Sequence, residues 1–201
     1  YITSSPELAS LLSRIEGVDG VITRAEIDSV NPDFWIPGFS AGWLAGYEFD
    51  TLPNHAYITP LSDKVDAWSE YFSKFGEKLK VGIRWAGNPK FEHQQFRKFP
   101  VEFITGLNKY PNDNVQLFSL QRDHNIIDLP EDIIDLQYQL TSWEETAGAI
   151  SNLDLVITSC TSIAHLAAAM GKPTWVIVPC LPYHTWACLL YTSPSPRDAT
   201  L

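Results

Sequence analysis

The segment 155–179 constrains the fold of this chain more than any other part of the sequence. It opens with an apolar β-branched run, Leu155–Ile157, continues through a polar stretch, and then runs through helix formers up to Met170. Gly171 ends the predicted helix, and a second apolar run at 175–178 predicts another strand. Two strands joined by so short a helix are typical of a parallel sheet that helices cover on both faces.

The polar turn after the first of these strands is a candidate anion site. Ligands of open parallel sheets bind beyond the carboxyl ends of the strands. The first N–H groups of a helix lack intrahelical partners and carry the positive end of the helix dipole, so a phosphate can bind there. Thr161, Ser162 and His165 are placed to contribute. The pattern fits equally well a helix capped by Thr161 or Ser162 with His165 packed in the core, and both interpretations stay open.

The same residues resemble a motif of GT-B glycosyltransferases, namely the heptosyltransferase-like family 9 and its relatives fused to tetratricopeptide repeats. In the C-terminal donor-binding domain of these enzymes, a strand leads into Ser-x-Asp/Cys-Thr-x-x-x-His-Leu-Ala, and Gly-Lys-Pro follows. This chain carries the pattern at Ser159–Ala167 and at Gly171–Pro173. Cys160 stands where heptosyltransferases usually carry Asp, which weakens the case for heptose as the donor sugar and makes the repeat-fused relatives more similar.

Further matches to the family occur in chain order. Val81–Pro89 resembles its opening strand and Gly-Asn-Pro loop, Arg97–Pro100 resembles an Arg-Ser-Ile-Pro element, and Phe118–Gln121 resembles a strand that ends in Ser-Leu-Gln. A weaker match, Phe49–Pro53, resembles Leu-Asp-Thr-Ile-Pro. The main resemblance therefore covers about Lys80–Ala187.

The resemblance implies a function and a set of site residues. The implied reaction transfers a sugar from a nucleotide-diphosphate sugar to an acceptor hydroxyl without a metal or other cofactor, and fixed N–H groups with Arg97 or Lys98 would stabilise the departing diphosphate. The general base is expected in the N-terminal domain, so no catalytic base is assigned here. The donor-binding residues that the resemblance implies are Trp85, Gly87, Asn88, Arg97, Gln121, Ser159, Cys160, Thr161, Ser162 and His165.

Charge and composition narrow the possible partners. The 201-residue chain has a net charge of −10 and no run of its 14 basic residues, which argues against a nucleic-acid partner. Arg84, Lys90, Arg97 and Lys98 gather around the Gly-Asn-Pro loop, a cluster that suits either a diphosphate or an ordinary solvated loop. No apolar run is long enough to span a bilayer. The three cysteines have no paired spacing, which predicts a reducing compartment and no metal site in the protein. The predicted location is therefore the cytoplasm, with peripheral attachment to the inner membrane face as an alternative.

The order of predicted elements defines the domains. From Lys80 onward, strands and helices alternate, which predicts a Rossmann-like doubly wound parallel sheet, the C-terminal half of a GT-B fold. The predicted elements are a helix in 6–15, a strand in 20–23, a helix in 61–80, strands in 81–85, 115–120 and 134–136, and helices in 100–110 and 143–152. Residues 1–60 are predicted to form the end of an acceptor domain and a crossover. Residues 61–187 are predicted to form the donor domain, and residues 188–201 a non-native or disordered tail.

The chain is interpreted as a fragment. Most of the acceptor domain is expected to be missing, so the fragment alone is expected to be inactive. The tail resembles translated adapter read-through on truncated environmental reads, which predicts a bacterial metagenomic origin. The full-length chain is expected to carry tetratricopeptide repeats as one possibility. The aromatic residues of the crossover are predicted to pack inside it rather than to form a ligand platform; they are Trp35, Phe39, Trp43, Tyr47 and Phe49. Two other functions remain open: a non-catalytic nucleotide-sugar-binding module of a repeat protein, and a GT-B-like sugar-nucleotide epimerase. The acceptor, whether glycan, lipid or protein, is not specified by the sequence.

Overall fold

The protein is described by a computed structural model. It covers residues 1–48, 51, 55–88, 90, 94–100, 103, 114–122, 129 and 133–179, without the side chains of Phe39, Gln94 and Gln95. Most of the predicted helix in 100–110, most of the weaker match at 49–53 and the whole predicted tail at 188–201 lie outside the described residues.

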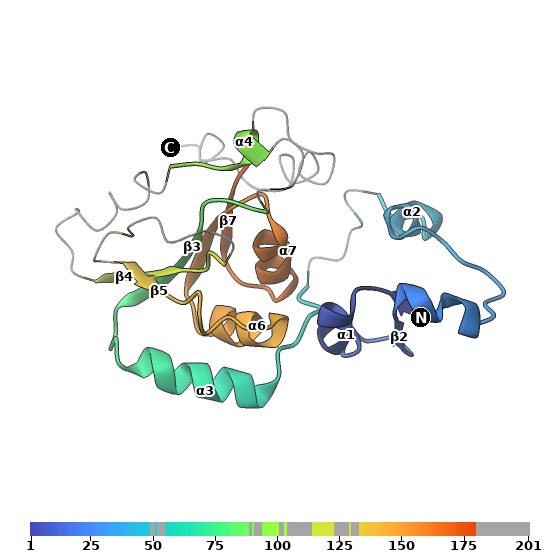
Figure 1. Cartoon of the computed structure of the whole chain (residues 1–201), viewed down its shortest axis with the longest axis horizontal. Helices are drawn as coiled ribbons and strands as arrows, with labels where there is room; N and C mark the ends of the chain where they lie inside the picture. The colour runs from blue at the N-terminus through green and yellow to red at the C-terminus, as the bar shows by residue number, and fades with distance from the viewer. Residues whose placement is uncertain are drawn as a thin grey trace.

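The centre of the fold is a five-stranded parallel sheet with the order β5-β4-β3-β6-β7 (Figure 1). The chain adds β4 and β5 on one side of β3 and then crosses over to add β6 and β7 on the other side. This arrangement confirms the predicted Rossmann-like α/β class. The strands are β3 (Leu79–Arg84), β4 (Val115–Ser119), β5 (Ile133–Asp135), β6 (Leu155–Ser159) and β7 (Thr174–Ile177).

Among the described residues, the helices that pack on this sheet contribute to one apolar cluster on one of its faces. A short parallel pair, β1 with β2, lies in the amino-terminal segment. The predicted helix in 61–80 is shorter than expected, because Gly76 adopts a positive φ of 60° and Leu79 already belongs to β3. The elements are β1 (Ile2–Thr3), α1 (Pro6–Leu12), β2 (Val21–Ile22), the 3-10 helix η1 (Arg24–Ser29), α2 (Gly38–Leu44), α3 (Ser62–Ser73), α4 (Gln94–Arg97), α6 (Trp143–Ser151) and α7 (Ser162–Ala169).

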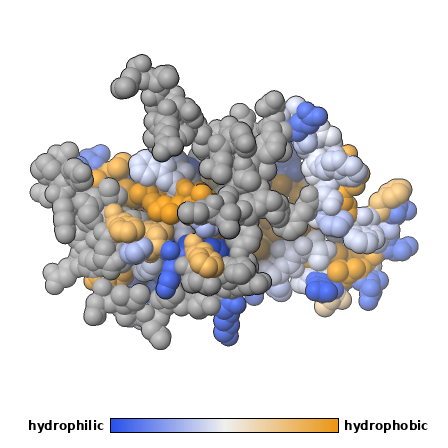
Figure 2. Space-filling model, turned by 90° about the horizontal axis from the view of Figure 1, so that it is seen from above, coloured by the Kyte–Doolittle hydropathy of each residue, from blue (hydrophilic) through white to orange (hydrophobic). Residues whose placement is uncertain are grey.

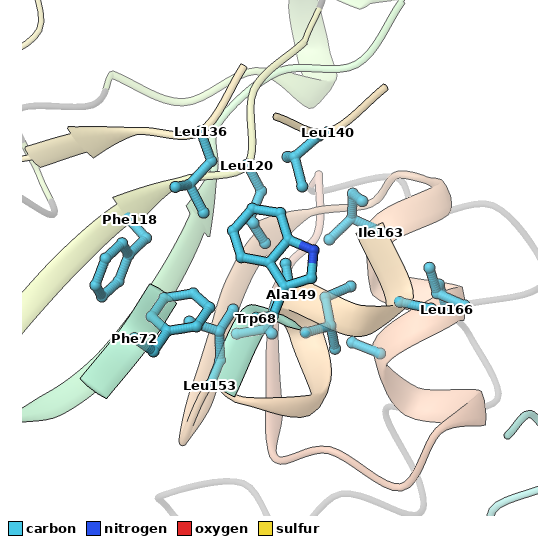
Figure 3. Close-up of a cluster of buried hydrophobic side chains, with 14 of the residues drawn as sticks. Trp68, Phe72, Phe118, Leu120, Leu136, Leu140, Ala149, Leu153, Ile163 and Leu166 are labelled. Atoms are coloured by element: carbon cyan, nitrogen blue, oxygen red, sulfur yellow. The ribbon is translucent and has the colours of Figure 1, made fainter. Parts of the chain in front are cut away.

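Successive residues of the strands point to opposite faces of the sheet and pack in two different apolar clusters. On one face, Phe118 of β4 packs with Phe72 of α3, with ring centroids 4.7 Å apart in an edge-to-face arrangement (Figure 3). On the other face, Val81 and Ile83 of β3 join a second cluster that includes Phe99 from the segment after α4. Burial on both faces explains why the strands read as continuous apolar runs rather than as alternating patterns.

Close approach of α3 and α6 makes Gly148 a sensitive position. A Cβ atom there would lie 2.8 Å from Cδ1 of Trp68 and 3.0 Å from the backbone carbon of Lys64. Helix propensity favours alanine by about 1 kcal/mol, but overpacking against a backbone atom costs about 1–3 kcal/mol. We expect Gly148→Ala to lower the free energy of unfolding by up to about 2 kcal/mol in urea titrations, because the overpacking outweighs the propensity. Gly42→Ala, where the new Cβ meets nothing within 4 Å, is the control, and equal stabilisation by both changes would contradict the argument.

The amino-terminal segment is attached to the sheet unit through Arg14. Its guanidinium donates two hydrogen bonds of 2.8 Å to the carboxylate of Glu144 at the start of α6, and Nε donates to the carbonyl of Thr59 at 2.9 Å. Beside it, Lys64 of α3 bonds Glu145 at 2.6 Å, and the indole N–H of Trp68 donates to the same carboxylate. These contacts join the segment just after α1 to α6, and α6 to α3. The predicted domain boundary at residue 60 stays a prediction.

The two ion pairs predict how stability changes in acid. Partial burial acts to raise the pKa of Glu144, but bonds from Arg14 and Ser10 outweigh it and lower this pKa below 4.5, while the bond from Lys64 is the main cause of the lowered pKa of Glu145. Both carboxylates therefore stabilise the fold above pH 4.5, and this stabilisation is lost as the pH falls through the lowered values.

We expect Arg14→Met to lower the free energy of unfolding by about 1 kcal/mol at pH 7. The difference from the parent protein should shrink as the pH falls below 4.5, because protonated Glu144 no longer pairs with Arg14. Denaturant titrations at several pH values measure this difference. A difference that stays constant from pH 7 to pH 3 would show that the ion pair contributes nothing.

Three of the five aromatic residues of the crossover do not pack as predicted, and the side chains of the other two, Phe39 and Phe49, lie outside the described residues. Trp35 is 82% exposed, Trp43 is 79% exposed and Tyr47 is 47% exposed. Figure 2 shows hydrophobic residues at the surface at the end of the molecule where Figure 1 places α2, and Phe34, Ile36 and Leu44 are exposed in this segment as well. The prediction failed for these residues because composition indicates that aromatic side chains need burial but does not indicate which surface buries them.

Candidate functional site

The predicted site residues come from loops at the carboxyl ends of β3, β4 and β6. These are three adjacent strands, with β3 in the middle. The strand order reverses at β3, and open α/β sheets bind ligands in the crevice beyond such a reversal point. Segments that are far apart in the sequence, namely 85–88, 120–122 and 159–165, thus meet at one edge of the sheet.

The loop after β3 is partly buried and partly exposed. Trp85 is 6% exposed and packs in the second apolar cluster, where its carbonyl accepts a hydrogen bond from the N–H of Phe99. Gly87 is buried, whereas Asn88 is exposed and its side-chain oxygen accepts from the backbone N–H of Lys90 at 2.9 Å. Of the three predicted donor-binding residues in this loop, Asn88 is therefore the one that presents its side chain to solvent.

Arg97 connects α4 to the polar turn before α7. Its Nε donates to Sγ of Cys160 at 3.3 Å, and another guanidinium N–H donates to the carbonyl of Cys160. Cys160 is only 2% exposed. Arg97 thus holds a positive charge next to the start of α7, and part of its hydrogen-bonding capacity positions the turn itself.

The start of α7 differs from an ordinary capped helix. Thr161 occupies the cap position with an extended backbone, but its side chain makes no capping hydrogen bond. Its hydroxyl lies 3.2 Å from the hydroxyl of Thr158 instead, and Ser162 is exposed. The structure therefore does not support the interpretation of Thr161 as a side-chain cap of this helix.

His165 lies one turn into α7 and is exposed rather than packed in the core. Desolvation by the surrounding protein, together with the positive charge of Arg97, lowers the pKa of His165 below 6.5. The imidazole is therefore mainly neutral at pH 7, and an anion bound beside it would favour its protonated form.

Gln121 and Ser159 are buried polar residues with unused hydrogen-bonding atoms. Gln121 is 3% exposed, and its Oε1 accepts from the N–H of Ala86 at 3.2 Å. Among the described residues, its Nε2 and the hydroxyl of fully buried Ser159 have no hydrogen-bond partner. Unpaired buried polar atoms are rare and destabilising, so both atoms are candidates for contact with a bound molecule.

Arg84 has a different position from the one that its charge suggested. It is 6% exposed, its Nε donates to the carbonyl of Ala86 at 3.1 Å, and Nη1 donates to the carbonyl of Leu120 at 3.1 Å. It therefore links the loop after β3 to the end of β4. The sequence signal for this role is an arginine within the otherwise apolar run 81–86, since a charge that is buried there needs hydrogen-bond partners.

Two other sequence features have structural roles. Gly171, with φ of 73°, ends α7 at the opposite edge of the sheet, where Lys172 donates to the carbonyl of Leu153 at 2.9 Å. The Gly-Lys-Pro part of the motif thus lies away from the candidate site. Glu144 and Glu145, at the start of α6, are engaged by Arg14 and Lys64.

The described part of the chain contains no candidate metal site and no candidate membrane-spanning helix. No group of three or more His, Cys, Asp or Glu residues there could hold a metal ion. No helix in the same residues is long and apolar enough to cross a membrane.

Comparison with known proteins gives two solved structures that match part of this chain. The glycosyl transferase family 9 protein from Veillonella parvula DSM 2008 matches with a TM-score of 0.50 and 14% identity, over 63% of this chain and 38% of that one. The ADP-heptose lps heptosyltransferase II of E. coli matches with a TM-score of 0.45 and 16% identity, over 63% and 41%. This chain thus matches about two fifths of the length of each. No protein-family model and no curated protein matches the sequence.

The first of these matches shows a shared fold. It is consistent with the parallel sheet and strand order described above and with the fold class predicted from the sequence. The shared fold covers only part of the Veillonella parvula protein. This match gives no support to the predicted association with tetratricopeptide repeats.

Proposed function

We propose that this chain binds a nucleotide-diphosphate sugar and is the donor-binding part of a glycosyltransferase. The observation that carries the proposal is the meeting of three predicted segments at the reversal point of the sheet. The start of α7, with exposed Ser162, lies beside the positive charge of Arg97. Helix N–H groups and a cation suit a diphosphate better than a neutral ligand, and this supports the predicted donor class.

The proposed reaction transfers the sugar to an acceptor hydroxyl. As the bond between sugar and diphosphate breaks, negative charge develops on the departing diphosphate, and groups already aimed at that charge lower the barrier. The start of α7 and Arg97 are proposed for this role. The acceptor and the general base are proposed to belong to a domain outside this chain, so we expect no acceptor-dependent turnover by the 201-residue chain alone.

Calorimetric titration of the 201-residue chain with nucleoside diphosphates and their sugars tests the proposal. We expect saturable binding of at least one compound, and Thr161→Ala combined with Ser162→Ala should weaken it about tenfold through lost hydrogen bonds. The control is Thr141→Ala with Ser142→Ala, the same pair of substitutions at the start of α6, where it removes a side-chain cap that the N–H of Glu145 uses. Absence of binding by the folded chain, or equal weakening by both double variants, would contradict the proposed site.

Metal independence has a separate test. We propose that protein N–H groups and cations alone hold the diphosphate. Affinity for the best nucleoside diphosphate should therefore be the same in excess EDTA as in millimolar Mg²⁺. A dissociation constant that rises tenfold or more in EDTA would show that a divalent cation takes part in binding.

A further inference from the structure

Gln121 has a fixed orientation that its surroundings explain. A glutamine side chain has one acceptor oxygen and one donor nitrogen, and their assignment follows from their partners. Here Oε1 accepts from the N–H of Ala86 at 3.2 Å, a group that can only donate. The donor Nε2 must then occupy the other side of the carboxamide, and it has no partner among the described residues.

The backbone around Gln121 is held on both sides. The carbonyl of Ala86 accepts from Arg84, while the N–H of Ala86 donates to Gln121, so both polar groups of this peptide residue are used. Arg84 also bonds the carbonyl of Leu120, the residue before Gln121. Because these bonds fix the loop after β3 relative to the end of β4, Gln121 cannot satisfy Nε2 by rotating without losing its bond to Ala86.

Register places Gln121 level with the candidate anion site. Ile83 pairs with Ser119 and Arg84 pairs with Thr158, so Gln121, Trp85 and Ser159 hold corresponding positions at the ends of β4, β3 and β6. Adjacent strands lie about 4.8 Å apart, which puts the ends of β4 and β6 about 10 Å from each other. A diphosphate at the start of α7 would span only part of that distance, so Gln121 would lie beside the portion of a nucleotide sugar beyond the diphosphate.

We propose that Gln121 is a specificity-determining residue whose Nε2–H donates a hydrogen bond to an acceptor oxygen of the bound nucleotide sugar outside the diphosphate. This inference rests on the proposed function. The contact occupies the buried donor that has no hydrogen-bond partner among the described residues. Since Nε2 has almost no exposed surface in this structure, the ligand must displace the atoms that cover it. The acceptor oxygen can belong to the sugar or to the nucleoside, and the ligands used in the test distinguish the two.

Gln121→Glu tests the contact with little change in shape. Glutamate keeps an acceptor for the N–H of Ala86, removes the donor and places a carboxylate near an anionic ligand. We expect the affinity for the best nucleotide sugar to fall at least tenfold. The matched control is Gln116→Glu, at the amino end of the same strand, where the affinity should stay within about twofold of the parent value. Gln121→Met is the second variant, because it removes the donor without adding charge.

The outcomes separate this inference from the proposed function. A loss seen with the nucleotide sugar and not with the nucleoside diphosphate assigns the acceptor oxygen to the sugar. A loss seen with both but not with inorganic pyrophosphate assigns it to the nucleoside, and an equal loss with pyrophosphate would contradict a contact outside the diphosphate. If the parent chain binds and both folded Gln121 variants bind equally well, the inference is wrong and the proposed function stands. A lower melting temperature with unchanged affinity would also overturn the inference, since it indicates an internal water or a purely structural role. If the folded parent chain binds none of the compounds, both proposals fail.

Discussion

Phe118→Ala is expected to lower the free energy of unfolding by about 3–5 kcal/mol, the largest effect of any single substitution considered for this chain. Phe118 is fully buried in β4, and its ring contacts Phe72 of α3 and Phe75 edge-on, with centroids 4.7 Å and 4.9 Å away. Alanine would leave a cavity between a central strand and a helix. The surrounding atoms can fill it only in part, because β3 and β5 fix β4 on both sides.

Chemical denaturation at pH 7 measures this effect, and Phe34→Ala is the matched control. Phe34 is 92% exposed, so its replacement should change the unfolding free energy by less than about 0.5 kcal/mol. A loss below about 1 kcal/mol for Phe118→Ala would mean that α3 does not pack on the sheet in solution as it does in this structure.

The sheet was predictable because its signals are local. Apolar runs bounded by polar turns marked β3, β4 and β6, and the two clusters that bury both faces account for the lack of alternation in these runs. The helix in 61–80 was predicted too long because Leu79 continues the helical spacing of Phe72 and Phe75. Its position is set by pairing with Val115, a contact that helical periodicity does not contain.

The location of the site was predictable, but the roles of its residues were not. Polar residues after buried parallel strands meet at one edge by topology, and so the sequence indicates which residues are neighbours. It does not indicate their hydrogen-bond partners. Arg84 and Arg97 both looked like cations for a phosphate, yet Arg84 bonds two backbone carbonyls and Arg97 bonds Cys160. Gln121 was chosen for its place at a strand end, and only its bond to Ala86 shows which of its atoms is free for a ligand.

Arg84→Met is expected to lower the free energy of unfolding by about 2–4 kcal/mol and to weaken nucleotide binding at least tenfold. The carbonyls of Ala86 and Leu120 each accept a hydrogen bond from the guanidinium, and methionine would leave both without this donor in a buried environment. Without that link, the loop after β3 is no longer held against the end of β4. The same change removes a positive charge from the edge of the sheet where we propose that an anionic ligand binds.

Arg84→Lys separates these two contributions. Lysine keeps the charge but lacks the planar fork that reaches two carbonyls, so we expect about half of the loss in stability and a smaller loss of affinity. Arg24→Met, at an exposed position in η1, is the control for the loss of one positive charge and should change neither property. Unfolding titrations measure stability, and calorimetry with the best nucleoside diphosphate measures affinity. If Arg84→Met were as stable as the parent protein and bound as tightly, the loop would be held by other contacts, and the charge of Arg84 would have no part in attracting the ligand.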